Sequence, residues 1–178
     1  MLFKPEMIQA ILAGQKTMTR RLVKEGEELI AWSEEADAVI NSKGRLRFRM
    51  GQKRAVCPGR GKPRVKYCSN CKTIPFVERY EYCNNCVTKI KEKLKPLFIE
   101  LVAIKKEKLL DISEEDAKRE GFNDREQFFL TFKEINSVRA KKALSLEKKG
   151  MYAKDSLWNE SDLEFNPDVW VLEFKVIL

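Results

Sequence analysis

The 178-residue sequence contains no histidine. Histidine is the most frequent general base in enzymes and a common metal ligand, and Ser–His and Cys–His nucleophile pairs depend on it. Its absence excludes these arrangements. Any catalysis by this chain must therefore use lysine, carboxylate, tyrosine or cysteine side chains, or a bound metal.

Long apolar runs are also missing from the sequence. No run approaches the roughly 20 residues that a bilayer span needs. The first residues, MLFKPEMIQAILAG, lack the continuous apolar stretch and the small-residue cleavage site of a signal peptide. We therefore expect a cytoplasmic protein without membrane contact. The hydrophobic fraction of 43% is ordinary for a globular protein, and the length fits one domain with at most a small appendage.

Acidic residues are absent from segment 43–66, which holds ten lysines and arginines in 24 residues. The formal charge of the chain is +8, so the other residues together carry about −2. The basic excess is local, which indicates a polyanionic partner, and nucleic acid is the commonest one in the cytoplasm. The alternative is a solvated lysine-rich surface of the thermophile kind, although such surfaces usually mix both signs.

Within this segment, the alternation of GRLRFRM predicts a strand with arginines on one face and apolar residues on the other. The expected arginine face consists of Arg45, Arg47 and Arg49, and the expected apolar face consists of Leu46, Phe48 and Met50. Three guanidinium groups in a row suit a phosphate backbone. The candidate nucleic-acid contacts are Arg20, Arg21, Arg45, Arg47, Arg49, Lys53, Arg54, Arg60, Lys62, Arg64 and Lys66.

Hydrophobic periodicity places the remaining elements. Helices are predicted at 4–16, 113–121 and 125–135, with Ser113 and Asp124 as N-caps. Strands are predicted at 17–23, 53–57, 96–112 and 168–178, whereas 32–44 is expected to be polar and irregular and 138–150 to be a helix or a mobile connection. The phenylalanines of 125–135 are expected in the core. Strands near both ends with helices between them predict an α+β, barrel-like domain.

Four of the five cysteines form two C-x2-C pairs separated by eleven residues. The pairs are Cys68 with Cys71 and Cys83 with Cys86. Four thiolates at this spacing predict a closed, tetrahedral and structural Zn²⁺ site. The alternatives are two disulfides or free thiols, and a reducing cytoplasm disfavours disulfides. Cys57 lies outside the pattern and is expected to be a small buried residue, with a reactive thiol as the other interpretation.

Several motifs, taken in order, resemble the ASCH family, whose β-barrel is related to PUA RNA-binding domains. The motifs are LFKPEMIQAILAGQKTMTRRL, PGRGKP, LLDISEEDAKREGF and PDVWVLEFK. The resemblance covers most of 2–56 and 97–176. Its most specific element is GQKTMTRR, residues 14–21, which is similar to the family signature G-x-K-T-x-T-x-R. The resemblance implies a single PUA-like domain over 1–178, flanked by helices, with the cysteine module inserted at 67–94.

The same resemblance implies a cleft for RNA or a nucleotide-like ligand. Small bacterial members similar to this chain are amidohydrolases that remove the acyl group from N4-acetylcytidine, and other members are associated with ribonuclease activity. The family's lysine, threonine and glutamate correspond here to Lys16, Thr19 and Glu120. This chain departs from the small members in its length, its cysteine module and its basic segment 43–66, which favour a larger polyanion.

The chemistry of these three residues is coherent by itself. A buried Lys16 with a lowered pKa could accept a proton from Thr19 or from water, and Glu120 could pass a proton to a leaving amine. Arg20 or Arg21 could then contact an oxyanion or a phosphate. Each residue also has an ordinary interpretation: Lys16 bonding the last carbonyls of the first helix, Thr19 as a plain strand residue and Glu120 facing solvent.

Three functional hypotheses follow. The first is an RNA-binding module that holds RNA on the basic strand and loop. The second is a hydrolase, either an amidohydrolase or a ribonuclease, with Lys16, Thr19 and Glu120 at its centre. The third is an adaptor whose zinc module contacts a protein partner.

Overall fold

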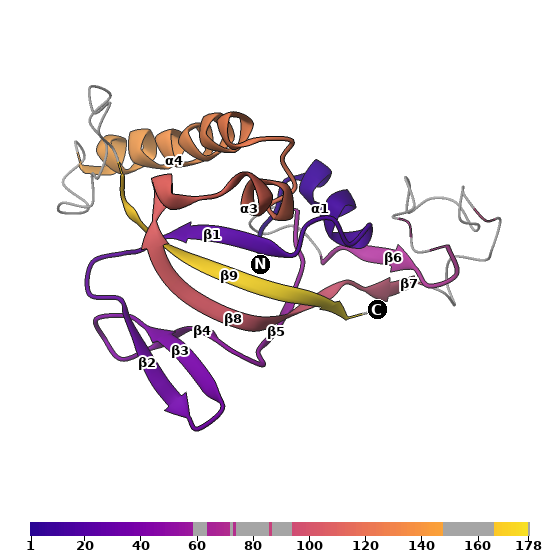
Figure 1. The fold of residues 1–178 in the computed structure, drawn as a ribbon, viewed down its shortest axis with the longest axis horizontal. Helices are drawn as coiled ribbons and strands as arrows, with labels where there is room; N and C mark the ends of the chain where they lie inside the picture. Colours follow the sequence, from indigo (N-terminus) through magenta and orange to yellow (C-terminus); the bar gives the residue numbers. More distant parts are fainter. Residues whose placement is uncertain (59–63, 72, 74–85, 87–93, 148–165, 178) are drawn as a thin grey trace.

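A computed structural model describes residues 1–58, 64–71, 73, 86, 94–147 and 166–177. These residues form a mixed structure of three antiparallel sheets and a few helices (Figure 1). The elements are, in chain order, α1 (Pro5–Leu12), β1 (Met18–Leu22), β2 (Glu28–Ser33), β3 (Ala36–Ile40), β4 (Leu46–Arg49), β5 (Lys53–Ala55), β6 (Lys66–Cys68), β7 (Leu94–Pro96), β8 (Phe98–Lys108), η1 (Leu109–Asp111), α3 (Glu114–Arg119), α4 (Arg125–Glu147) and β9 (Asp168–Ile177).

The largest sheet has the order β1-β9-β8-β5, so the C-terminal strand lies between strands from the first and middle parts of the chain. A register shift between Leu101 and Ala103 interrupts the pairing of β8 with β9. Such a bulge increases the local bend and twist of a strand, and β8 is strongly curved (Figure 1). The sheet therefore curls into a half-barrel with an inner and an outer face.

Each face of this sheet has its own hydrophobic core. Helices α3 and α4 lie over the outer face, and the β2–β4 sheet lies on the other side (Figure 1). The outer core consists of Met18, Leu109, Ile112, Ala117, Phe128, Phe132, Val169 and Val171. The inner core consists of Phe3, Ile8, Ile11, Val39, Phe48, Val56, Val65, Tyr67, Leu97, Ile99, Leu101, Ile104, Trp170, Leu172 and Phe174.

Most predicted elements are confirmed. The Ser113 hydroxyl accepts from the Asp116 N–H at 3.0 Å, and the Asp124 carboxylate accepts from the Gln127 N–H at 2.7 Å, as expected of N-caps. Phe128 and Phe132 are buried as predicted. Cys57 was expected to be buried, but it is partly exposed. The α+β class is confirmed in a coarse form, as a curved half-barrel sheet with a few helices.

Two predictions between residues 32 and 50 were wrong. The segment 32–44 is not irregular, since β2 and β3 form a hairpin there that pairs onward with β4. The strict alternation of 45–50 also fails, because the β3–β4 register shifts between Val39 and Ile40. Leu46 is consequently 38% exposed, whereas Phe48 is buried. No helix among the described residues is long and apolar enough to cross a membrane.

Candidate functional site

Lys16, which follows α1, forms an ion pair with Glu120 at the end of α3. After α1, Gly14 adopts a φ of +74°, and the N–H groups of Gln15 and Lys16 both donate to the carbonyl of Ala10. This tight turn directs Lys16 towards the end of α3, where Glu120 is the C-cap residue. Lys16 Nζ lies 2.8 Å from Glu120 Oε2 and also donates to the Glu120 carbonyl. Both side chains are almost completely buried.

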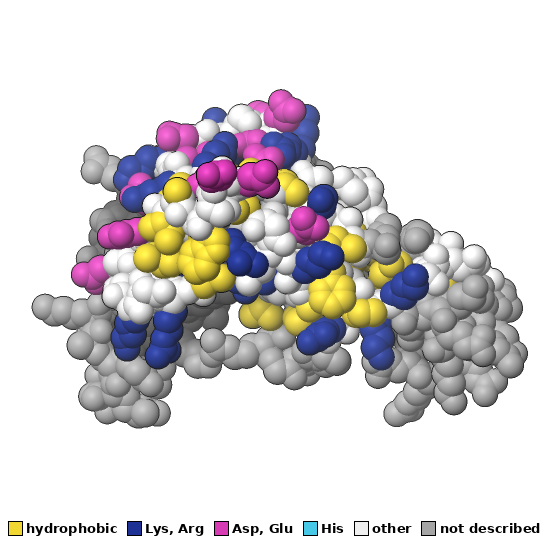
Figure 2. All heavy atoms as spheres, turned by 90° about the horizontal axis from the view of Figure 1, so that it is seen from below, with side chains coloured by type: hydrophobic (Ala, Val, Ile, Leu, Met, Phe, Trp, Pro, Cys, Tyr) yellow, Lys and Arg dark blue, Asp and Glu magenta, His cyan; other side chains and the backbone are white. Residues whose placement is uncertain are grey.

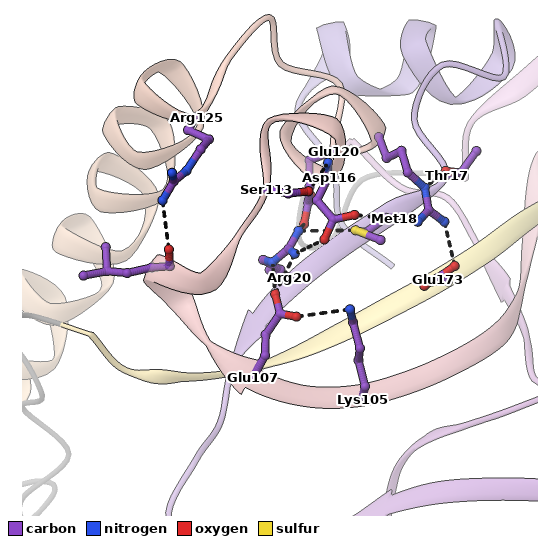
Figure 3. Close-up of polar contacts among 12 residues, drawn as sticks. Thr17, Met18, Arg20, Lys105, Glu107, Ser113, Asp116, Glu120, Arg125 and Glu173 are labelled. Carbon is purple, nitrogen blue, oxygen red and sulfur yellow. Dashed lines mark hydrogen bonds and ion pairs between the residues drawn. The ribbon is translucent and has the colours of Figure 1, made fainter.

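Arg20 extends this pair into a larger ion network, which Figure 3 shows around its guanidinium group. Its Nη2 lies 2.6 Å from Glu107 Oε1 and 2.8 Å from Asp116 Oδ2, and its Nη1 lies 3.4 Å from Glu120 Oε1. The carboxylates come from β8, α3 and the end of α3. One arginine of β1 thereby connects β1, β8 and the helix that covers them.

Burial and charge act in opposite directions on the two cations of the network. Burial lowers the pKa of Lys16 below its usual 10.5, although the neighbouring Glu120 raises it. Burial also lowers the pKa of Arg20, but Glu120, Asp116 and Glu107 outweigh this effect and the net shift is upward. Arg20 thus remains a fixed cation, while Lys16 is the more easily deprotonated of the two.

Thr19 lies on the opposite face of β1 from Arg20. In the register with β9, Thr19 is opposite Leu172 of the inner core, and Arg20 is opposite Val171 of the outer core. Thr19 is 3% exposed. Among the described residues, no side-chain hydrogen bond connects Thr19 with Lys16 or Glu120. The structure therefore brings together two of the three candidate catalytic residues.

The candidate nucleic-acid residues separate into buried and exposed groups. Arg20 is 2% exposed, and its guanidinium already contacts the carboxylates of Glu107 and Asp116. Arg47 is ion-paired with Glu27, whose Oε2 also accepts from Trp170 Nε1 at 2.9 Å. Arg21 and Arg54 are partly buried. Arg60 and Lys62 lie outside the described residues.

Cations without an ion-pair partner are concentrated in the basic segment. Elsewhere on the described surface, Lys24, Lys95 and Lys118 lack an ion pair with a described residue, whereas five lysines are paired: Lys4, Lys105, Lys106, Lys108 and Lys175. Within it, five exposed cations make no side-chain ion pair with any described residue: Lys43, Arg45, Lys53, Arg64 and Lys66. The segment therefore presents charge that the described part of the chain does not neutralise.

The β2–β4 sheet adds exposed apolar groups that the sequence reasoning missed. Trp32 is 48% exposed, Leu29 is 41% exposed and Leu46 is 38% exposed. Seen from below, hydrophobic side chains gather in the middle of the molecule with lysines and arginines around them, and acidic side chains gather towards one edge (Figure 2). The cross-strand register that exposes Leu46 depends on pairing between strands, and no local pattern in the sequence signals it.

Three of the four predicted metal ligands lie close together. The sulfur atoms of Cys68, Cys71 and Cys86 all lie within 4.8 Å of one another, and those of Cys68 and Cys86 are 3.6 Å apart. Cys83 lies outside the described residues. The Cys68 N–H donates to the Thr73 carbonyl at 2.8 Å, which closes the turn that contains Cys71. Three converging thiols fit the donor set of a soft divalent metal such as zinc.

Comparison with known proteins gives little further information. No protein-family model matches the sequence, and no curated protein matches it. Among solved structures, the chain is similar to one described as a high-resolution crystal structure of an ASCH domain from Lactobacillus crispatus JV V101. The two chains are 17% identical with a TM-score of 0.40, and the match covers 94% of this chain and 68% of that one. The sequence identity and the TM-score are both too low to assign the family.

Proposed function

We propose that the protein is an ASCH-like, PUA-related RNA-binding module. The observation that carries the proposal is the concentration of exposed cations in segment 43–66, which contains no acidic residue and in which five cations make no ion pair with a described residue. A surface with several such cations binds a polyanion by displacing its counterions. The motif resemblance to the ASCH family supports the choice of RNA among the polyanions.

The test is the salt dependence of RNA binding. In a triple variant, Arg45→Gln, Arg64→Gln and Lys66→Gln, three candidate phosphate contacts are lost. For single-stranded RNA, log K decreases as log salt increases, and each phosphate contact contributes roughly 0.7 to the steepness of this line. The line should therefore be less steep by about 2 in the triple variant. Fluorescence anisotropy with a labelled RNA of about 15 nucleotides measures both slopes at several salt concentrations.

The matched control removes three lysines that already have carboxylate partners: Lys105→Gln, Lys106→Gln and Lys175→Gln. The total charge change equals that of the test variant. RNA binding should weaken much less in this control. Equal weakening in both variants would mean that only the net charge of the chain matters, and no binding by wild type at 20 mM salt would remove the proposal.

We also propose a second candidate function, hydrolysis of an acyl group from an N4-acylated cytidine or of an RNA phosphodiester. The specific observation that favours it is a lysine with a lowered pKa in direct contact with a buried carboxylate. Such a pair can accept a proton from an attacking water or hydroxyl and return it to the leaving group. Lys16 would be the base, Glu120 the proton carrier and Thr19 the attacking or positioning hydroxyl.

This candidate is tested with N4-acetylcytidine and with an end-labelled RNA. Wild-type protein should release acetate or shorten the RNA, and Glu120→Gln should reduce the rate by at least about a hundredfold. Glu134→Gln is the matched control, because Glu134 is an exposed carboxylate that pairs with Lys4 away from the Lys16–Glu120 pair. Activity that survives Glu120→Gln in a folded variant would point to a contaminating hydrolase.

We further propose that Cys68, Cys71, Cys83 and Cys86 together hold one structural Zn²⁺. Convergence of the three described sulfurs supports the proposal. With four protein thiolates, the ion would have no open position for substrate, so its role would be to hold the segment between β6 and β7. This module could also contact a protein partner.

A further inference from the structure

The guanidinium group of Arg20 is held in one orientation by contacts from each of its nitrogen atoms. Nε donates to Glu107 Oε1 at 2.8 Å, and Nη2 lies 2.6 Å from the same oxygen and 2.8 Å from Asp116 Oδ2. Nη1 donates to Met18 Sδ at 3.3 Å and to Glu120 Oε1 at 3.4 Å (Figure 3). These contacts use every N–H group of a guanidinium, so Arg20 has no donor left for a ligand.

The carboxylate of Glu120 is divided between two cations. Its Oε1 accepts from Arg20, whereas its Oε2 accepts from Lys16 Nζ at 2.8 Å. Lys16 Nζ also donates to the Glu120 carbonyl, so both of its hydrogen bonds to described residues go to Glu120. Because Arg20 is itself held by β8 and α3, it fixes which oxygen of Glu120 faces Lys16.

Arg20 also affects where the proton of this buried pair resides. A buried lysine and a buried carboxylate form either a charged pair or a neutral one, because burial disfavours both charges. A permanent cation beside the carboxylate favours its ionised form, and the same cation repels a charged lysine. Burial lowers the pKa of Lys16 most, Glu120 raises it, and Arg21 and Arg20 lower it further.

Other charged groups surround Arg20 rather than the pair. Among the described residues, the charged groups that act on Lys16 are Glu120 and the two arginines of β1. Arg20 contacts two further carboxylates, one from β8 and one from α3, and each of these is paired with a cation nearer to the surface. These outer pairs are Glu107 with Lys105 and Asp116 with Arg119. Arg20 is therefore the link between the buried pair and the charges at the surface.

We propose that Arg20 is a positioning residue for the candidate hydrolase site: it keeps the Glu120 carboxylate ionised and turned so that one oxygen faces Lys16. In the reaction proposed above, Lys16 must start uncharged to accept a proton from water, and Glu120 must start ionised to receive that proton and pass it to the leaving group. Arg20 favours both starting states. This consequence rests on the proposed hydrolase function, whereas the effect of Arg20 on Lys16 does not. Residue 20 is a variable position of the signature G-x-K-T-x-T-x-R, so the family resemblance gives Arg20 no role.

The alternative is that Arg20 only connects β1, β8 and α3, in which case its loss would lower stability without a specific effect on Lys16. Arg20→Gln removes the charge, and Arg20→Lys keeps the charge but lacks the planar fork. Arg119→Gln is the matched control, because it removes the same charge from the residue next to Glu120. Arg119 pairs with Asp116 and Glu173 instead of Glu120.

The first measurement is the pKa of Lys16 in the folded variants, by NMR of lysine labelled at Cε. In Arg20→Gln this pKa should rise by about one pH unit, because a nearby like charge is lost and its carboxylate partners are no longer neutralised. It should stay close to the wild-type value in Arg20→Lys. Arg119→Gln should change it by less than about 0.3, because Arg119 is partly exposed and therefore screened. An unchanged pKa in Arg20→Gln, or an equal rise in Arg119→Gln, would overturn the proposal.

A second pair of variants applies if Arg20→Gln does not fold, since that change strands three carboxylates. The double variant Arg20→Gln with Glu107→Gln removes one charge of each sign and places two neutral amides opposite each other. It is compared with Glu107→Gln alone. The pKa of Lys16 should again be higher by about one pH unit in the double variant. Equal values in these two proteins would overturn the proposal.

The second measurement is the rate of N4-acetylcytidine hydrolysis between about pH 6 and pH 9. Wild-type kcat should rise with pH as Lys16 loses its proton, and this rise should move to higher pH in Arg20→Gln by the difference found by NMR. At neutral pH, kcat should fall about tenfold, because one pH unit lowers the uncharged fraction of the amine by that factor. KM should change little, since Arg20 is buried and has no donor for the substrate. Arg20→Lys should lower kcat without moving the pH profile, because only the geometry is changed.

The two measurements separate the role of Arg20 from the proposed reaction. An active Arg20→Gln variant with the pH profile of wild type would overturn the proposal and leave the hydrolase function intact. No hydrolysis by wild type would remove the hydrolase function and the chemical role of Arg20 with it. A raised pKa of Lys16 in Arg20→Gln would, even then, support the effect of Arg20 on the buried pair.

Discussion

Lys16 Nζ lies 2.8 Å from Glu120 Oε2, and neither side chain exposes more than 3% of its surface. Breaking a buried ion pair at one partner leaves an uncompensated charge and costs about 3 to 5 kcal/mol. We expect Glu120→Gln and Lys16→Met each to reduce the free energy of unfolding by an amount of this order. The double variant should lose much less than the sum of the two.

Wild type, the two single variants and the double variant form a double-mutant cycle. Urea unfolding of these four proteins gives the coupling energy between Lys16 and Glu120. A coupling below about 0.5 kcal/mol would show that the pair behaves like an exposed one. Glu134→Gln is a suitable control, because its partner Lys4 is about one third exposed and an exposed pair contributes little.

The titration of Lys16 should be unusual. Burial lowers its pKa, so between its folded pKa and its unfolded pKa the unfolded chain binds more protons than the folded one. Stability should therefore rise with pH through that window, and Lys16→Met should lack this contribution. NMR of lysine labelled at Cε, with Lys16→Met for assignment, measures the pKa directly. A value at or above 10.5 would contradict the expectation.

Arg20 and Arg119 offer a contrast between a buried and an exposed arginine that both reach Asp116. Arg20 is fully buried among three carboxylates, whereas Arg119 is 37% exposed and pairs with Glu173 at 2.6 Å. Arg20→Met should cost about 3 to 5 kcal/mol, and Arg119→Met should cost less than about 1 kcal/mol.

Denaturant unfolding at pH 7 measures both costs. Equal costs for Arg20→Met and Arg119→Met would contradict the assigned network.

The sequence predicts this molecule best where the signal is local. Ser113 and Asp124 are caps within three residues of their partners, and the helices that they begin are found as expected. The role of Arg20 depends on Glu107, which is 87 residues away in the chain. No short pattern reports such a contact, and the sequence alone therefore predicts a phosphate contact for an arginine that lies within the family-like signature. The bulge opposite Val39 and Ile40 is likewise a property of strand pairing, and it changes which residues of β4 face solvent.

Metal binding by the cysteine module can be tested with a matched cysteine. Purified protein should contain about one Zn²⁺ per chain, and Cys68→Ser and Cys86→Ser should each lose it. Cys57→Ser should keep the ion, because Cys57 does not belong to the group of converging sulfurs. The main unfolding transition should change little on chelation, since the two large cores contain none of the ligand cysteines. A chromogenic chelator measures how much Zn²⁺ each variant releases. Thermal unfolding with and without the chelator shows whether the main transition depends on the metal. Loss of zinc in Cys57→Ser, or its retention in Cys68→Ser, would mean that the ion is held elsewhere.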